Sequence, residues 1–120
     1  MPNTIPYQDF LKGYDMDGNN NIDLIGTAGG APEYSHTVLS EAFFTLPLSV
    51  RRLSGTEDRL ILTVSERLLA ALGAEIEKGT RLTVNGQIRS YNRRTESGSR
   101  LFITVFAREL FISGSGWAWM

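Results

Sequence analysis

The sequence has no cysteine, a single histidine and no long apolar run. The absence of cysteine excludes a disulfide scaffold, thiol catalysis and zinc sites with cysteine ligands. No apolar segment reaches the roughly 20 residues that a membrane-spanning helix needs. The N-terminal segment MPNTIPYQDF lacks the basic start and apolar centre of a signal peptide. We therefore expect a cytoplasmic protein that has no membrane partner.

An excess of charge of either sign is also lacking, because 12 basic and 13 acidic residues give a net charge of −1. A neutral total counts against nucleic-acid binding, since domains that bind nucleic acid are often basic. The charges are nevertheless unevenly distributed, with acidic residues gathered near the start. The last third of the chain holds a group of arginines: Arg81, Arg89, Arg93, Arg94, Arg100 and Arg108. A local basic face can therefore coexist with the neutral total.

Residues suited to catalysis are few. His36 follows the glycine-rich segment 28–32 and has no second histidine or cysteine to pair with, so we interpret it as a loop residue. The carboxylates Glu66, Glu75 and Glu77 stand where a helix start and turns account for them. No pair of residue types suits a nucleophile and its base. We expect no enzymatic activity and no cofactor.

One segment partly matches a metal-binding loop. Residues 15–26, DMDGNNNIDLIG, match a calcium-binding EF-hand loop at its first, third, fifth and eighth positions. Asn20 stands where this loop needs glycine, and Gly26 stands where it needs a bidentate glutamate. The next residues, TAGGAPE, cannot continue as a helix. We interpret Asp15 to Asp23 as a polar turn that leads into a strand, with cation binding as the less favoured alternative.

Strand patterns fill most of the chain from residue 21 onward. A period of two in hydrophobicity predicts strands at 21–27, 41–52, 58–65, 81–94 and 100–112. Ser65 can cap a short helix over 66–72, and Gly73 can end it. A polar hairpin loop is expected at 95–99. Three strands, a short helix and two strands predict an all-β OB-fold, a five-stranded Greek-key barrel with the helix between strands 3 and 4.

The strand over 81–94 carries an unusual polar face. Leu82, Val84 and Ile88 fall on one side, which we expect to be buried. On the other side Arg89, Tyr91 and Arg93 follow one another at every second position. Cations that alternate with an aromatic ring suit a phosphate backbone and a stacked base. The alternative is an ordinary solvated strand face, where arginine and tyrosine are common.

The last strand is apolar on both sides in its middle. Leu101, Ile103, Val105 and Ala107 lie on one side, and Phe102, Thr104 and Phe106 lie on the other. Such a pattern is typical of a strand that is covered on both faces. Either the barrel or a second subunit would cover it, and the side with Phe102 and Phe106 suits contact with a second subunit.

Four segments in this order resemble the bacterial single-stranded DNA-binding protein family, SSB. They are NIDLIGTAGGAPE, FFTLPLSVRR, the stretch KGTRLTVNGQIRS, and LFITVFARELFI. The resemblance covers residues 21–112, which we expect to form the OB-fold domain between an irregular N-terminal arm, 1–20, and a flexible Gly/Ser tail, 113–120. It implies single-stranded DNA as the partner and assembly into a dimer or a tetramer.

The chain departs from the SSB family in its aromatic residues and in its tail. The family stacks bases on tryptophans of the barrel, whereas this chain has none between residues 21 and 112. Trp117 and Trp119 in the tail could fold back, meet another subunit or stack on bases. The long linker and the acidic tip that recruits replication proteins are missing. A short paralogue of plasmid or phage origin, or a relative of the primosomal replication protein N group, would account for these departures.

These observations predict a sequence-tolerant single-stranded DNA-binding protein of replication, recombination or repair. Arginines would neutralise phosphates, aromatic rings would stack on bases, and the hairpin over 91–100 would extend over its strand. The residues expected at the DNA are Phe43, Arg51, Arg59, Arg89, Tyr91, Arg93, Arg94, Arg100 and Phe102. The alternative is an OB-fold protein-interaction module of a primosome-like or recombination complex that binds DNA weakly. Replication or recombination proteins would be its partners.

Overall fold

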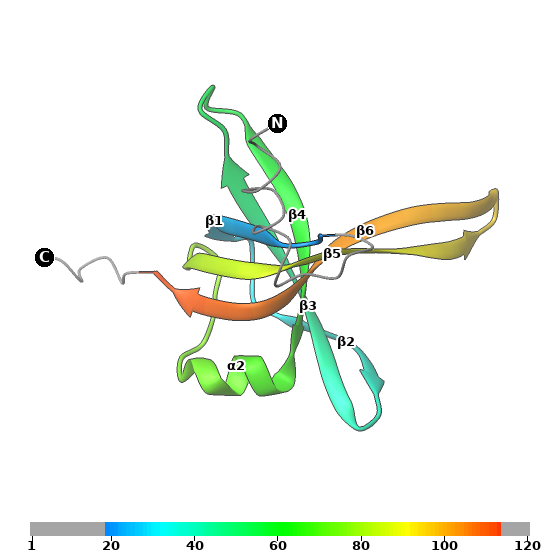
Figure 1. The fold of residues 1–120 in the computed structure, drawn as a ribbon, viewed down its shortest axis with the longest axis horizontal. Coiled ribbons are helices and arrows are strands. Elements are labelled where there is room, and N and C mark those ends of the chain that lie inside the picture. The colour runs from blue at the N-terminus through cyan, green and yellow to red at the C-terminus, as the bar shows by residue number, and fades with distance from the viewer. Residues whose placement is uncertain (1–18, 114–120) are drawn as a thin grey trace, which may run out of the picture.

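The computed structural model describes residues 19–113, which form a closed six-stranded sheet and one short helix (Figure 1). The elements are β1 (Ile22–Ala28), β2 (Glu33–Val38), β3 (Glu41–Arg51), β4 (Glu57–Ser65), α2 (Glu66–Leu72), β5 (Arg81–Thr95) and β6 (Gly98–Ile112). The strand order is β1-β5-β6-β4-β3-β2, and the pairing of β1 with β3 closes the barrel. The predicted OB-fold is confirmed. Asp15, Asp17, Trp117 and Trp119 lie outside the described residues.

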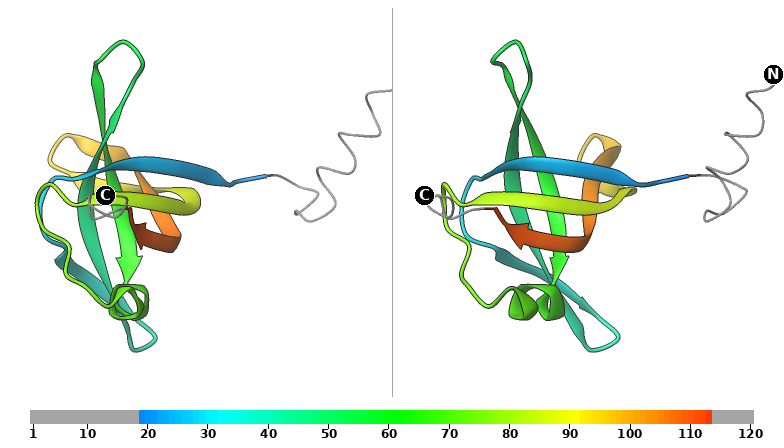
Figure 2. Two further views of the ribbon diagram at one scale, coloured as in Figure 1. Left: turned by 90° about the vertical axis from the view of Figure 1, so that its left-hand side faces the viewer. Right: turned by 60° about the vertical axis from the view of Figure 1, so that its left-hand side comes forward.

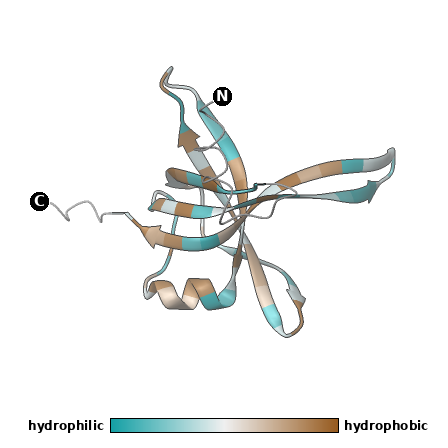
Figure 3. Cartoon of the chain, in the orientation of Figure 1, coloured by the Kyte–Doolittle hydropathy of each residue, from teal (hydrophilic) through white to brown (hydrophobic). Residues whose placement is uncertain are grey.

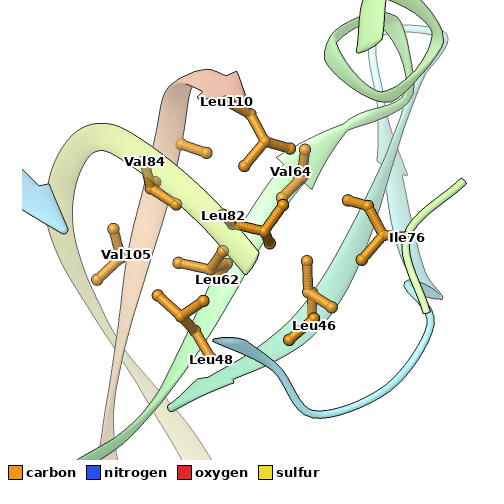
Figure 4. Close-up of a cluster of buried hydrophobic side chains, with 11 residues drawn as sticks. Leu46, Leu48, Leu62, Val64, Ile76, Leu82, Val84, Val105 and Leu110 are labelled. Carbon is orange, nitrogen blue, oxygen red and sulfur yellow. The ribbon is translucent and has the colours of Figure 1, made fainter. Parts of the chain in front are cut away.

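The core fills the barrel with side chains from alternating positions of its strands (Figure 4). Six of these side chains are fully buried: Leu46, Leu48, Leu62, Val64, Leu82 and Val84. The period of two places each pair on the inner face of one strand. Burying a side chain of this size contributes roughly 1.5–3 kcal/mol. Among residues 19–113, no helix is long and apolar enough to cross a membrane.

Helix α2 has the ends that its sequence predicts. The Ser65 hydroxyl accepts a hydrogen bond from the backbone N–H of Leu68 at 3.1 Å, and Gly73 ends the helix in the left-handed conformation with φ of 73°. The apolar stripe of α2 packs partly against the core. The helix therefore covers one end of the barrel (Figure 2).

We expect Ser65→Ala to lower the free energy of unfolding by about 1 kcal/mol, because the N–H of Leu68 loses its acceptor. Urea denaturation followed by circular dichroism measures this loss. Ser65→Asp is the matched control and should retain most of the stability, since aspartate is also a good cap. Equal loss in both variants would show that the cap contributes nothing.

Strand β2 is absent from the sequence prediction, which placed His36 in a loop. All six residues of β2 are exposed, so no apolar alternation marks the strand. Its turn into β3 passes through Leu39 and Ser40, with φ of 50° and 70°. Tight hairpin turns with positive φ usually contain glycine or asparagine, which are missing here. The interpretation of His36 as a loop residue was therefore wrong.

The outer halves of β5 and β6 form a long hairpin, residues 88–105, which we call the arm. The predicted loop at 95–99 was too long, because β5 pairs through Thr95 and β6 begins at Gly98, which leaves only Glu96 and Ser97 in the turn. Figure 1 shows the arm projecting away from the barrel rather than lying over a strand. The side-chain amide of Asn20 pairs with the backbone N–H and C=O of Ile88, at 2.8 and 2.7 Å.

A β-bulge lies in β6 a few residues from the base of the arm. Asn85 pairs with Glu109 but Gly86 pairs with Ala107, so Arg108 is an extra residue without a partner on β5. A bulge bends the strand and increases its twist. Past this bend β6 still pairs with β4 at Phe106 and Val105. Opposite Val105, Ile88, which the sequence placed on a buried side, is 46% exposed.

Candidate nucleic-acid interface

The pairing of β5 with β6 gives the arm two different faces. Residues directly opposite each other in an antiparallel pair lie on the same face. Tyr91 is opposite Phe102, Arg93 is opposite Arg100, and Arg89 is opposite Thr104. We call this the cation-aromatic face, and its members are Arg89, Tyr91, Arg93, Arg100, Phe102, Thr104 and Phe106.

Rings and guanidinium groups are already stacked on this face. The rings of Tyr91 and Phe102 lie 5.6 Å apart between centroids, with an interplanar angle of 15°. The guanidinium carbon of Arg93 lies 5.0 Å from the centre of the Phe102 ring, and that of Arg100 lies 5.8 Å from it. Arg89 lies over the ring of Phe106 at 4.1 Å. Cation–π contacts of this kind hold the cations at the ring surface.

The cation-aromatic face forms one wall of a groove whose other walls come from β2, β3 and β4. The groove has a volume of about 490 Å³ and is lined by Ser35, His36, Thr45, Ile61, Thr63, Tyr91, Arg93 and Thr104. On its floor the hydroxyls of Thr63 and Thr104 are hydrogen bonded at 2.8 Å. Thr104 also donates to the carbonyl of Ile61 at 2.8 Å. These bonds attach the base of the arm to β4.

A second series of rings crosses from β2 to the arm. The imidazole of His36 is stacked on the ring of Phe43, with centroids 5.2 Å apart and an angle of 18°. Phe43 in turn meets Phe106 at 5.7 Å. The Ser35 hydroxyl lies 2.8 Å from Nδ1 of His36 and can hold the ring in this orientation. His36, Phe43 and Phe106 therefore form a continuous series of ring contacts, and Arg89 lies over the last of these rings.

Sequence reasoning did not select His36 or Phe106 for this site. The sequence indicated that the side with Phe102 and Phe106 suits contact with a second subunit, and the structure places both rings on the cation-aromatic face. The place of Phe106 could have been found, since it lies four residues after Phe102 on the same side of one strand. His36 could not have been assigned to this site from the sequence, because its position depends on β2, which the sequence did not predict.

The structure brings together most of the residues expected at the DNA. Phe43, Arg89, Tyr91, Arg93, Arg100 and Phe102 all lie on the cation-aromatic face or in its ring contacts. Arg59 lies on the same side of β4 as Ile61 and Thr63 by alternation. Arg94 is opposite Ser99, on the other face of the arm.

The arginines beside the turn between β3 and β4 form ion pairs with carboxylates, which distinguishes them from the arginines of the arm. Arg51 lies 3.7 Å from Glu57, so its charge is already paired. Arg52 donates two hydrogen bonds to Asp58, at 2.9 and 2.7 Å, and they lower the pKa of that carboxyl. Within residues 19–113 the ion pairs do not involve the arginines of the arm. Among the described residues, the arginines of the cation-aromatic face are therefore not paired with a carboxylate.

The described part of the chain has no cluster of three residues that could hold a metal ion. Asp23, the last residue of the candidate cation-binding segment 15–23, lies in β1, where the strand pattern over 21–27 also placed it. Its carboxylate accepts a hydrogen bond from the side-chain amide of Asn85 at 2.8 Å. This carboxylate thus has a structural partner within the sheet.

The solved structure of the dimeric N-terminal domain of PriB protein from Thermoanaerobacter tencongensis is similar to this chain. The two are 41% identical, the match covers 82% of this chain and 100% of that chain, and the TM-score is 0.70. No family model matches the chain, and no curated protein matches it. The likeness supports an SSB-like OB-fold family, and it does not reach the bacterial SSB family specifically.

Proposed function

The chain belongs to the family of the PriB N-terminal domain, and from this premise we propose that it binds single-stranded DNA, without sequence preference, in a primosome-like replication complex. The proposal includes a homo-oligomer, a cytoplasmic setting and no catalytic step. The observation that carries it is the cation-aromatic face beside the groove. Roles in recombination and repair follow from the same chemistry, since both processes expose single strands.

The geometry of the cation-aromatic face suits a single strand of DNA that runs along the arm. Arg89, Arg93 and Arg100 would neutralise phosphates, and each contact would release counterions from the DNA. The stacked pair of Tyr91 and Phe102 would receive a base on its exposed side. Stacking is tolerant of sequence because every base has a π-face. The lining hydroxyls of Thr63 and Thr104 bond to each other, so they offer little readout of base edges.

Fluorescence anisotropy of a labelled oligo-dT, titrated with the protein at several salt concentrations, tests this function. We expect binding that is selective for the single strand over a duplex control. Three phosphate contacts predict a slope of log K against log salt of about −2, from about −0.7 for each contact. Equal binding to both DNA forms, or binding that does not change with salt, would contradict the proposal.

His36 is expected to act as the ring that a base meets on the β2 side of the groove, because it covers one face of Phe43. We expect His36→Ala to weaken oligo-dT binding by roughly fivefold or more, since stacking is worth about 1–3 kcal/mol per base. His36→Phe should restore affinity, because it keeps an aromatic ring. Thr37→Ala, at the next position of β2, is the control and should bind like the wild type. A loss in all three variants would instead indicate disruption of the hairpin.

A protein-interaction module is the second candidate function. The net charge of −1 and the absence of tryptophan between residues 21 and 112 favour it. In that case the barrel would serve assembly, and DNA binding would be weak with a shallow salt slope. A stable complex with a replication protein in the absence of DNA would support this candidate.

A further inference from the structure

A second groove lies beside helix α2, and we call it the α2 groove. It has a volume of about 450 Å³, and its lining comes from the segment before β2, from Phe44 of β3, from α2 and from residues 74–76. Phe44 lines this groove, whereas the preceding residue Phe43 contacts the ring of Phe106 at the arm. Successive residues of a strand point to opposite sides. The α2 groove and the cation-aromatic face therefore lie on different sides of β3.

The centre of the α2 groove is apolar. Ile76 is buried in the core, and Leu69 and Phe44 are partly buried. Tyr34 is 62% exposed and meets Phe44 edge-on, with ring centroids 6.0 Å apart. Figure 3 shows hydrophilic colour where α2 begins and hydrophobic colour further along it. An exposed aromatic ring beside an apolar hollow is typical of the positions where protein interfaces concentrate their binding energy.

The charged residues that line the α2 groove are both acidic. They are Glu66 and Glu75, which are exposed, and no lysine or arginine of the described residues lines the groove. Within residues 19–113 neither carboxylate takes part in an ion pair. Arg67, the neighbour of Glu66 in α2, pairs with Glu41 at 3.1 Å, so that pair adds no net charge. The groove therefore combines an apolar centre with negative charge.

This combination favours a basic segment of another protein as the occupant. DNA is disfavoured, because the carboxylates would repel its phosphates. A small molecule is disfavoured because its site normally fixes it with a few precisely placed polar groups, whereas both carboxylates here are exposed. The ends of this chain lack the complementary charge. Residues 1–18 contain Asp9, Asp15 and Asp17 against Lys12, and residues 114–120 contain no charged side chain.

We propose that the α2 groove binds a partner protein through an amphipathic segment that carries both apolar side chains and lysine or arginine. The apolar side chains would enter the hollow beside Leu69 and Ile76, and the cations would pair with Glu66 and Glu75. An apolar centre within a polar rim is the usual composition of a protein interface. Because the cation-aromatic face lies on the other side of β3, this binding does not depend on DNA binding.

A fluorescent peptide of leucine and lysine, patterned as an amphipathic helix and titrated with the full chain, tests the proposal by anisotropy. We expect it to bind at least about tenfold more tightly than the same peptide with glutamate in place of lysine, or with serine in place of leucine. Ala70→Lys should weaken binding by at least about tenfold, because it places a bulky cation in the groove. Ala71→Lys is the matched control, since Ala71 is the next residue of α2 and does not line the groove. Both alanines are exposed and lysine is a good helix former, so both variants should fold, which circular dichroism checks.

The contribution of charge is tested by Glu66→Gln with Glu75→Gln, which should weaken binding of the leucine–lysine peptide. Glu96→Gln with Glu109→Gln makes the same change in net charge outside the groove and should bind like the wild type. A wild type that binds the three peptides equally, or equal affinities of Ala70→Lys and Ala71→Lys for the leucine–lysine peptide, would overturn the proposal. Oligo-dT binding should be unchanged in Ala70→Lys. A chain that binds the peptide but not oligo-dT would remove the DNA role and leave the α2 groove as a protein site.

Discussion

Replacing Gly86 by alanine is expected to destabilise the barrel by roughly 3 kcal/mol, at the upper end of the usual cost of overpacking. A Cβ atom at this position would overlap the carbonyl oxygen of Phe106 and lie 3.0 and 3.1 Å from the carbonyl carbon of Phe106 and the Cα of Ala107. These are backbone atoms of the paired strand, which cannot rotate away as a side chain could. Relief would require β5 and β6 to separate at the bulge.

Urea denaturation of Gly86→Ala beside the wild type measures this cost. Gly30→Ala is the control, because a Cβ at Gly30 meets no atom within 4 Å. We expect the control to unfold at the wild-type midpoint or slightly above it, since alanine restricts the unfolded chain. A Gly86→Ala midpoint equal to that of the control would show that the bulge can shift to accept a methyl group.

The parts of the fold that follow local rules could be predicted from the sequence. Leu46 and Leu48 of β3, and Leu62 and Val64 of β4, are apolar at alternate positions, and all four are buried as the alternation predicts. Ser65 and Gly73 mark both ends of α2, because capping depends on the residue type at one position. These signals need no knowledge of distant residues.

The parts that depend on long-range pairing could not be predicted. Strand β2 is exposed on both faces and is held by its ladder with β3 and by the contacts of Tyr34 and His36 with rings of β3, which leaves no hydrophobic alternation in its sequence. The face of Ile88 was predicted correctly, but its exposure depends on where the barrel ends. Thr95 and Gly98 look like loop residues, yet they pair across the turn.

The candidate site was predictable along one strand and unpredictable across strands. Arg89, Tyr91 and Arg93 share a face through alternation alone. The stacking of Phe102 on Tyr91 requires the register of β5 with β6, which the short turn sets. The place of His36 at the groove requires β2 and its irregular pairing with β3, which puts His36 opposite Phe43. The groove is lined by segments that are far apart in the sequence, so it could not be predicted without the three-dimensional structure.

Replacing both Tyr91 and Arg93 by alanine is expected to weaken oligo-dT binding by at least about tenfold without unfolding the protein. Loss of the tyrosine removes a stacking surface worth about 1–3 kcal/mol. The same change leaves Phe102 without its stacked ring and without the guanidinium 5.0 Å from its centre. Loss of the arginine should also make the salt slope shallower by about 0.7, because one phosphate contact disappears. Anisotropy titrations at several salt concentrations measure both effects.

The matched control for this variant comes from the same strand. Ser90→Ala with Asn92→Ala changes the two alternate positions, which point to the other face of the arm. If the DNA lies on the cation-aromatic face, the control should keep both the affinity and the salt slope of the wild type. Equal losses in the two double variants would mean that the arm contributes through its rigidity and not through this face. An unchanged affinity in the Tyr91 and Arg93 variant would place the DNA elsewhere on the barrel.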